Sequence, residues 1–176
     1  MTSFPRPHDE VASGDDGAPA PFPAGKTVAV IGGGQLGRML AMDGMHLGLD
    51  FAFLDPTGDE CAAAPLARRV VRGGLSDGAA IAALAEGADV LTCEIEHINT
   101  AALAELEAKG VNVQPSAASL ALIQDKLTQK AHFAAAGVRI PAFAATPDAA
   151  AVADAARQFG LPLMLKVRER SDTFRV

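Results

Sequence analysis

The sequence predicts an α/β fold in which a mostly parallel, doubly wound sheet carries helices on both faces. The apolar run KTVAVI (residues 26–31) enters a glycine turn, GGGQLG, at residues 32–37. A helical pattern follows and leads to a second apolar run that ends at Asp55. Helix and strand patterns then keep alternating with short loops between them. This alternation is typical of sheets built from parallel strands with crossover helices.

The glycine turn predicts a site for an anionic small molecule. Gly32, Gly34 and Gly37 match the G-x-G-x-x-G spacing between a strand and a helix. Glycine turns sharply without a Cβ clash, and it lets backbone N–H groups approach an anion at the positive end of a helix. Asp55 lies 18 residues after Gly37, where a ribose-binding acid is expected. The same pattern also occurs in tight turns that bind no ligand.

Further strands and helices are expected between Asp55 and Pro115. Short strands are predicted at residues 68–71, 88–92 and 111–113. One helix is predicted at 77–86, with Ser76 as its N-cap and Gly87 beyond its end, and another from Asn99 to Lys109. In the helix after the glycine turn, three methionines at i, i+3 and i+6 predict a packed face: Met39, Met42 and Met45.

The character of the sequence changes near Pro115, where we expect a second lobe to begin. Residues 116–136 have a helical pattern with a break around Asp125. Another helix is predicted with Thr146 as N-cap and Gly160 beyond its end, followed by a strand at 161–166. The expected organisation is a disordered extension at 1–25, a substrate-binding domain at 26–118 and an incomplete lobe at 119–176.

Composition excludes several classes of function. The formal net charge is −6 and the chain has no Trp and no Tyr, which argues against a nucleic-acid partner. No apolar stretch is long enough to span a bilayer, so no membrane partner is expected. The two cysteines, Cys61 and Cys93, are far apart in sequence, which favours a reducing cytoplasm and no disulfide or zinc site.

Two carboxylates follow the predicted strand at 88–92. On a strand, Glu94 and Glu96 would share one face and Cys93 would point the other way, so we expect no metal site there. Carboxyl ends of strands are where open α/β sheets bind ligands, and one of these acids is expected to accept hydrogen bonds from a sugar hydroxyl. The alternative is a pair of solvated acids, and His97 is expected to be a surface histidine.

Three lysines are candidate phosphate ligands. Lys126 and Lys130 share one helix face, and for Lys130 a solvated position is expected. Lys166 ends the predicted apolar strand at 161–166, where its ammonium group would meet a phosphate or simply extend into solvent.

These stretches together resemble N5-carboxyaminoimidazole ribonucleotide synthetase, an ATP-grasp ligase of purine biosynthesis formerly described as the ATPase subunit of phosphoribosylaminoimidazole carboxylase. The matching motifs occur in the family's order: GGGQLGRM, Asp55-Pro56, TCEIEHI, QPS, QDKLTQK and GLPLMLK. They cover residues 26–166. The resemblance implies a Rossmann-like pre-ATP-grasp domain followed by the start of an ATP-grasp lobe.

The resemblance also implies a reaction. ATP, with Mg²⁺ bridging its phosphates, would phosphorylate bicarbonate to carboxyphosphate, and the amine of 5-aminoimidazole ribonucleotide would then be carboxylated. By position, the glycine turn would hold the ribonucleotide through Gly32, Gly33, Gly34, Gln35, Leu36 and Gly37. Glu96 or Glu94 would face the ribose, and Lys126 and Lys166 would contact ATP. The family's typical homodimer is the implied assembly.

The sequence departs from the family after Lys166. The family continues with a glycine-rich loop containing Tyr-Asp-Gly, whereas this chain reads VRERSDTFRV and has no glycine after Gly160. The family's later metal-binding acids have no counterpart here. We therefore expect a truncated or frame-shifted N-terminal part that does not catalyse the whole reaction by itself.

Two other interpretations fit part of the sequence. The glycine pattern and Asp55 also suit an NAD(P)-binding Rossmann domain of an oxidoreductase, although Pro56 and the QDKLTQK segment are not needed by such a domain. The incomplete second lobe suits a non-catalytic remnant or a binding module. Ligand preference distinguishes the three interpretations.

Overall fold

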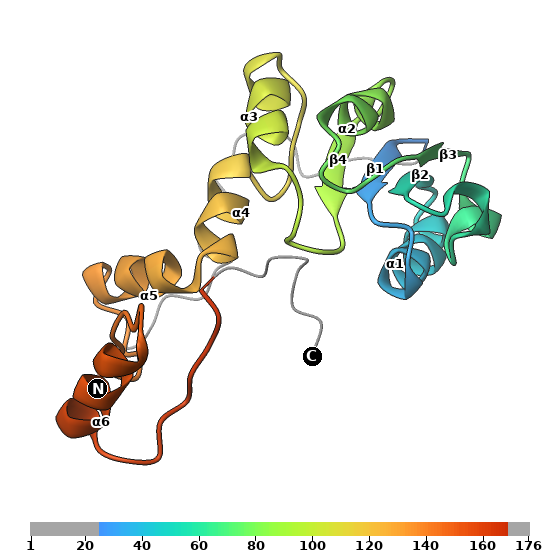
Figure 1. Ribbon diagram of the computed structural model, residues 1–176. Helices are drawn as coiled ribbons and strands as arrows, with labels where there is room; N and C mark the ends of the chain where they lie inside the picture. Colours follow the sequence, from blue (N-terminus) through green and yellow to red (C-terminus); the bar gives the residue numbers. More distant parts are fainter. Residues whose placement is uncertain (1–24, 169–176) are drawn as a thin grey trace, which may run out of the picture.

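The computed structural model describes residues 25–168 and contains a four-stranded sheet in which all the paired strands are parallel. The extension expected at 1–25 lies outside the described residues, apart from Gly25. The strand order is β3-β2-β1-β4, as Figure 1 shows. The strands are β1 (Thr27–Ile31), β2 (Asp50–Asp55), β3 (Arg69–Arg72) and β4 (Val90–Cys93). The predicted parallel α/β fold is therefore confirmed.

Helices cover both faces of the sheet because side chains along each strand alternate between two apolar clusters. On one face, α1 (Gln35–His46) contributes Ala41 to the cluster that contains Val30 and Phe53. On the other face pack α2 (Gly78–Ala85), α3 (Thr100–Ala108) and α4 (Ala117–Gln124). The two sides are visible in Figure 1, where α1 and α2 lie on opposite sides of the strands.

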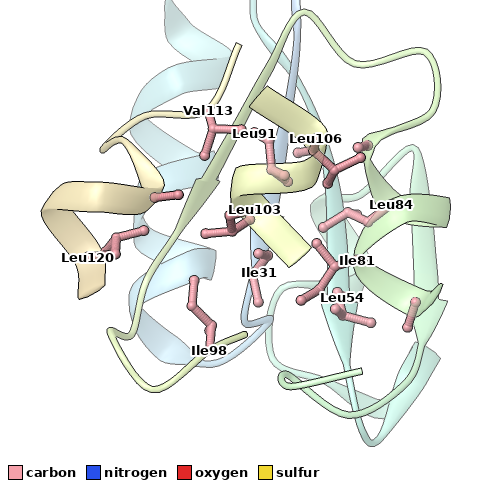
Figure 2. Close-up of a cluster of buried hydrophobic side chains, with 14 of the residues drawn as sticks. Ile31, Leu54, Ile81, Leu84, Leu91, Ile98, Leu103, Leu106, Val113 and Leu120 are labelled. Atoms are coloured by element: carbon pink, nitrogen blue, oxygen red, sulfur yellow. The ribbon is translucent and has the colours of Figure 1, made fainter. Parts of the chain in front are cut away.

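The larger cluster joins the sheet to three helices, and Figure 2 shows its side chains. Ile31, Leu54 and Leu91 point from neighbouring strands toward Ile81 and Leu84 of α2 and toward side chains of α3 and α4. Its largest fully buried side chains are Ile31, Leu54, Ile81, Leu84, Leu91 and Leu103. Burial of this apolar area is the main stabilising contribution to the domain.

Two short 3₁₀ turns follow β2, and the segment that contains them contacts the glycine turn. They are η1 (Gly58–Glu60) and η2 (Ala64–Leu66). Between and beside them, the side chains of Cys61 and Ala63 are buried in the smaller cluster. The N–H of Ala63 donates to the carbonyl of Gly33 at 2.9 Å, so this segment holds the glycine turn in place.

Helix N-caps follow the expected chemistry, with two shifts of position. The side chain of Asn99 caps α3, as predicted, by accepting from the N–H of Ala102 at 3.0 Å. Asp77, not Ser76, caps α2. Likewise α6 (Ala149–Phe159) is capped by Asp148 and not by Thr146. In both cases an aspartate one or two residues downstream presents its carboxylate to the first free N–H groups.

The strand expected at 111–113 forms only a single parallel bridge between Val113 and Leu91. The N–H of Leu91 donates to the carbonyl of Asn112, and the N–H of Gln114 donates to the carbonyl of Leu91, both at 2.8 Å. The chain therefore touches the outer edge of β4 and turns away into α4.

The C-terminal part extends away from the sheet (Figure 1). The expected break at Asp125 is confirmed, because α4 ends and α5 (Lys126–Ala135) begins there. The strand expected at 161–166 is wrong: this segment is irregular, and Leu161 and Met164 are 80% and 81% exposed. A strand needs a neighbour to accept its backbone hydrogen bonds, and none of residues 25–168 supplies one here.

The packed methionine face predicted for α1 is also wrong. Met39, Met42 and Met45 are about half exposed, whereas the buried positions of the helix are Gly37, Ala41 and Gly44. A Cβ at Gly44 would lie 2.4 Å from the ring of Phe51, so α1 approaches the sheet through its small residues.

At 12 residues α1 is the longest helix in the described range, and no helix there is long and apolar enough to cross a membrane.

The buried cluster yields a first prediction. Substituting Leu84→Ala should lower the free energy of unfolding by about 2–5 kcal/mol, because Leu84 is fully buried between α2 and the sheet. Leu47→Ala is the matched control, since Leu47 is 47% exposed and its loss should change stability by less than about 0.5 kcal/mol. Urea unfolding followed by circular dichroism measures both, and equal effects would contradict the described core.

Candidate functional site

The candidate site lies where the connections of the sheet change direction. From central β1 the chain proceeds to β2 and β3 on one side and then returns to place β4 on the other side of β1. Open α/β sheets bind ligands at such a switch point, outside the carboxyl ends of the strands. The glycine turn follows β1 and residues 94–98 follow β4, so both segments flank this point.

The glycine turn is closely packed against the chain around it. Gly32 has a φ of +104°, a conformation that favours glycine, and its N–H donates to the carbonyl of Leu54 at 2.9 Å. A Cβ at Gly33 would lie 2.6 Å from the Sγ of Cys61. Gly34 is the N-cap of α1 and has no capping side chain of its own. The N–H groups at the start of α1 therefore need another acceptor.

Glu94 supplies that acceptor. Its Oε1 accepts from the N–H of Gly34 at 3.0 Å, and its Oε2 accepts from the N–H of Gly37. The N–H of Glu94 in turn donates to the carbonyl of Ile31 at 3.1 Å. A negative charge is favourable at this end of a helix. The anion that the glycine pattern predicted at the turn is, in this structure, a side chain of the same protein.

Glu96 lies apart from Glu94, and the expectation that the two acids share one strand face is wrong. β4 ends at Cys93, and residues 94–96 form bends that break the alternation of side chains. The Oε1 of Glu96 lies 3.4 Å from the Nε2 of His97. Burial, together with the charge of Glu96, raises the pKa of the Cys93 thiol. The side chain of Glu96 is 37% exposed, so this acid is partly open to solvent in the segment that follows β4.

Asp55 is also engaged within the chain. Its carboxylate accepts from the N–H of Gly33 at 3.1 Å and from the N–H and hydroxyl of Thr57 at 2.8 and 2.6 Å. Burial works against its ionisation, but these hydrogen bonds outweigh burial and lower the pKa of Asp55. In this structure the acid expected to bind a ribose instead ties the end of β2 to the glycine turn.

Gln35 and Leu36 form the exposed part of the turn. Both are exposed, Leu36 at 64%, and their N–H groups hydrogen-bond to no residue in the range 25–168. They occupy the first two positions of α1, where N–H groups point out of the helix. Within the turn, these donors remain open to a ligand.

Gln124 holds the segment after β4 in place, a role that the sequence analysis missed. The Nε2 of Gln124 donates to the carbonyls of Glu96 and Ile98 at 2.6 and 2.8 Å. It is the last residue of α4, directly before the helix break. Its place at the start of the QDKLTQK motif was the only indication in the sequence that it has a role. Through this contact α4 fixes the loop that carries Glu96.

The two lysines expected to contact ATP lie on neighbouring segments. The N–H of Lys126 donates to the carbonyl of Arg168 at 3.0 Å, so the segment that carries Lys166 passes beside the start of α5. The Nζ of Lys126 donates to the carbonyl of Ile123 at 3.0 Å. Lys166 is exposed on an irregular segment and not at the end of a strand.

An ion pair joins these two segments. The Nε and Nη2 of Arg168 contact the carboxylate of Asp125 at 2.6–2.9 Å, and hydrogen bonds from Thr128 add to this. Arg168 is the main reason that the pKa of Asp125 lies well below its usual range.

The ammonium of Lys130 lies 5.6 Å from the centre of the Phe143 ring and so faces an aromatic side chain.

A parallel sheet with a glycine turn at its switch point places this chain in the doubly wound α/β class, in which ligands typically bind at that point. The model of the ribonucleotide synthetase preATP-grasp domain matches residues 25–124. The chain belongs to that family, and the resemblance to N5-carboxyaminoimidazole ribonucleotide synthetase is confirmed.

Individual relatives agree with this assignment. N5-carboxyaminoimidazole ribonucleotide synthase of Pseudomonas aeruginosa is 40% identical over 141 residues, which are 80% of this chain and 38% of the relative. The crystal structure of the Thermotoga maritima synthetase superposes with a TM-score of 0.75 at 33% identity, covering 82% of this chain and 39% of that one. The Aspergillus clavatus synthase was solved with ADP and 5-aminoimidazole ribonucleotide. It superposes with a TM-score of 0.69 at 33% identity, and the match covers 81% of this chain and 38% of that one. This chain spans about two fifths of the length of these relatives.

The contacts of Asp55 yield a pH prediction. Because folding lowers the pKa of Asp55, its stabilising contribution is fully present above the unfolded value of 3.8 and is lost as the pH falls through the lower folded value. Asp55→Asn should therefore be less stable than the wild type at pH 7, and the difference should shrink below pH 3.8. Urea unfolding at pH 7 and pH 3 measures this, with Asp59→Asn, an exposed site, as control. A difference independent of pH would contradict the assigned role of the carboxylate.

Proposed function

We propose that this chain is the N-terminal part of a cytoplasmic ATP-dependent ligase of purine biosynthesis. The complete enzyme carboxylates 5-aminoimidazole ribonucleotide with bicarbonate by way of carboxyphosphate. The observation that carries the proposal is the site at the switch point, in a domain of the ribonucleotide synthetase family. A relative of this family was solved with ADP and the same ribonucleotide, which supports the assignment of both ligands.

In this proposal the domain formed by residues 26–118 binds the ribonucleotide. Gly32, Gly33, Gly34, Gln35, Leu36 and Gly37 form one wall, and the open N–H groups of Gln35 and Leu36 are the donors available to an anionic group. Glu96, in the segment that follows β4, is the acceptor proposed for the ribose hydroxyls because its carboxylate is partly exposed. Glu94 contributes to binding by holding the turn in shape.

ATP is proposed to lie near the start of α5. Lys126 and Lys166 would contact its phosphates, and the hydrogen bond between Lys126 and Arg168 supports this by bringing their segments together. The phosphoryl transfer to bicarbonate would depend on positioning and on neutralisation of charge. Residues 119–168 form the start of the lobe that would enclose this nucleotide.

Mg²⁺ is proposed to bind with ATP and to bridge its phosphates. Mg²⁺ is usually held by one or two carboxylates together with substrate phosphates and waters, and not by a cage of protein ligands alone. Within residues 25–168 no group of three or more His, Cys, Asp or Glu side chains lies close enough together to form such a cage. The carboxylates that would bind this Mg²⁺ are proposed to come from the rest of the enzyme.

The ribonucleotide assignment predicts a change in melting temperature. 5-Aminoimidazole ribonucleotide should raise the melting temperature of the chain, because a ligand that binds only the folded state stabilises it by mass action. Glu96→Gln should weaken binding about tenfold, the value of one hydrogen bond to a charged group. Glu105→Gln, on the exposed side of α3, should leave affinity unchanged. No stabilisation by the ribonucleotide, or stabilisation by NADH instead, would contradict the proposal.

The ATP assignment predicts a difference between lysines. Lys166→Ala and Lys126→Ala should each weaken ATP binding to this chain in isothermal titration calorimetry, because each removes a positive charge beside the phosphates. Lys130→Ala is the control, since its ammonium faces Phe143 and should not affect ATP. Equal affinity in all three variants and the wild type, or no ATP binding at all, would refute the assignment for this chain.

A further inference from the structure

Three backbone donors of the glycine turn are already bound by carboxylates of this chain. Glu94 accepts from the N–H groups of Gly34 and Gly37, and Asp55 accepts from the N–H of Gly33. In a dinucleotide-binding turn, such N–H groups are the ones that hold the diphosphate. Here two carboxylates occupy them without any ligand.

The position of Glu94 also accounts for the glycine spacing. A Cβ at Gly32 would lie 2.4 Å from the Cγ of Glu94, and a Cβ at Gly34 would lie 2.8 Å from its Oε1. At Gly37 the added Cβ would lie 3.0 Å from Oε2 and 2.8 Å from the carbonyl oxygen of Gly32. At all three positions of the G-x-G-x-x-G pattern an added Cβ would therefore crowd the side chain of Glu94, and at Gly37 it would also crowd the carbonyl of Gly32.

Charge makes this arrangement selective. A diphosphate placed over the turn would compete for the N–H groups of Gly34 and Gly37 and would bring its negative charges against a partly buried carboxylate. Like charges at short range repel each other strongly when water is partly excluded. A ligand that leaves Glu94 in place meets only the outer part of the turn, at Gln35 and Leu36.

We propose that Glu94 is a specificity-determining residue: its carboxylate fixes the glycine turn and excludes the diphosphate of a dinucleotide from it. The inference concerns the same turn as the proposed ribonucleotide site, and it deepens that proposal by defining which phosphate ligands the turn rejects. It stands on contacts within the chain, so its test does not require the ribonucleotide to bind.

The test uses the full chain labelled with ¹⁵N, with the amide signals of Gly34 and Gly37 as reporters. In the wild type, inorganic pyrophosphate and NADH should leave both signals unchanged. In Glu94→Ala the two donors become free, and affinity for pyrophosphate should rise at least about tenfold, the value of one charge-assisted hydrogen bond. Glu105→Ala, an exposed site on α3, is the matched control and should behave as the wild type.

Formate provides a second readout, which tests the part of the proposal in which the carboxylate fixes the glycine turn. Its carboxylate can replace that of Glu94, so it should raise the melting temperature of Glu94→Ala more than chloride at equal ionic strength does. Wild type and Glu105→Ala should show no such difference. Shifts of the Gly34 and Gly37 signals on adding pyrophosphate or NADH to the wild type would overturn the proposal, and this arm decides even if Glu94→Ala does not fold. A folded Glu94→Ala that gains no pyrophosphate affinity would also overturn it, whatever its response to formate.

Discussion

The carboxylate of Glu94 is the contact on which the site depends. It joins the end of β4 to the start of α1 by accepting from Gly34 and Gly37, and its own N–H is bound to the end of β1. The two segments that flank the switch point are thereby fixed relative to each other. The first N–H groups of a helix have no hydrogen-bond partner within the helix, so a carboxylate at this place accepts hydrogen bonds from them. Its negative charge also interacts favourably with the positive end of the helix dipole.

Around this contact, further polar contacts tie the loops at the carboxyl edge of the sheet to one another. Asp55 binds the turn from the end of β2, and Ala63 binds it from the segment that follows. Gln124 reaches from α4 to the carbonyls of the loop that carries Glu96. The loop that carries Glu96 is therefore connected to α4 through these carbonyl acceptors, so a shift of α4 would displace this loop. The apolar clusters on the two faces of the sheet supply the rigid support beneath these contacts.

The family assignment separates the three interpretations that the sequence left open. Membership of the ribonucleotide synthetase preATP-grasp family favours a ligase over a dinucleotide-dependent oxidoreductase. The contacts of Glu94 and Asp55 give a physical reason in the same direction, since the donors and the acid that a dinucleotide would use are engaged within the chain. Beyond α4 the domain gives way to helices with few buried residues and to an exposed apolar segment. The chain spans between about a quarter and two fifths of the length of the relatives that it matches.

The sequence by itself determined the four strands of the parallel sheet, the glycine turn at its edge, the helix break at Asp125 and the family. The elements follow from local patterns: continuous apolar runs, glycines at turns and side chains that cap nearby N–H groups. The family follows from the motifs that the chain shares with it. Only the tertiary structure decided that Glu94 binds the turn, that Glu96 lies beside His97, and that α1 packs through Gly44 while its methionines are half exposed. It also decided that residues 161–166 form no strand. Each of these outcomes depends on a partner distant in sequence, whether a helix end, an aromatic ring or a neighbouring strand, and a local pattern carries no information about such a partner.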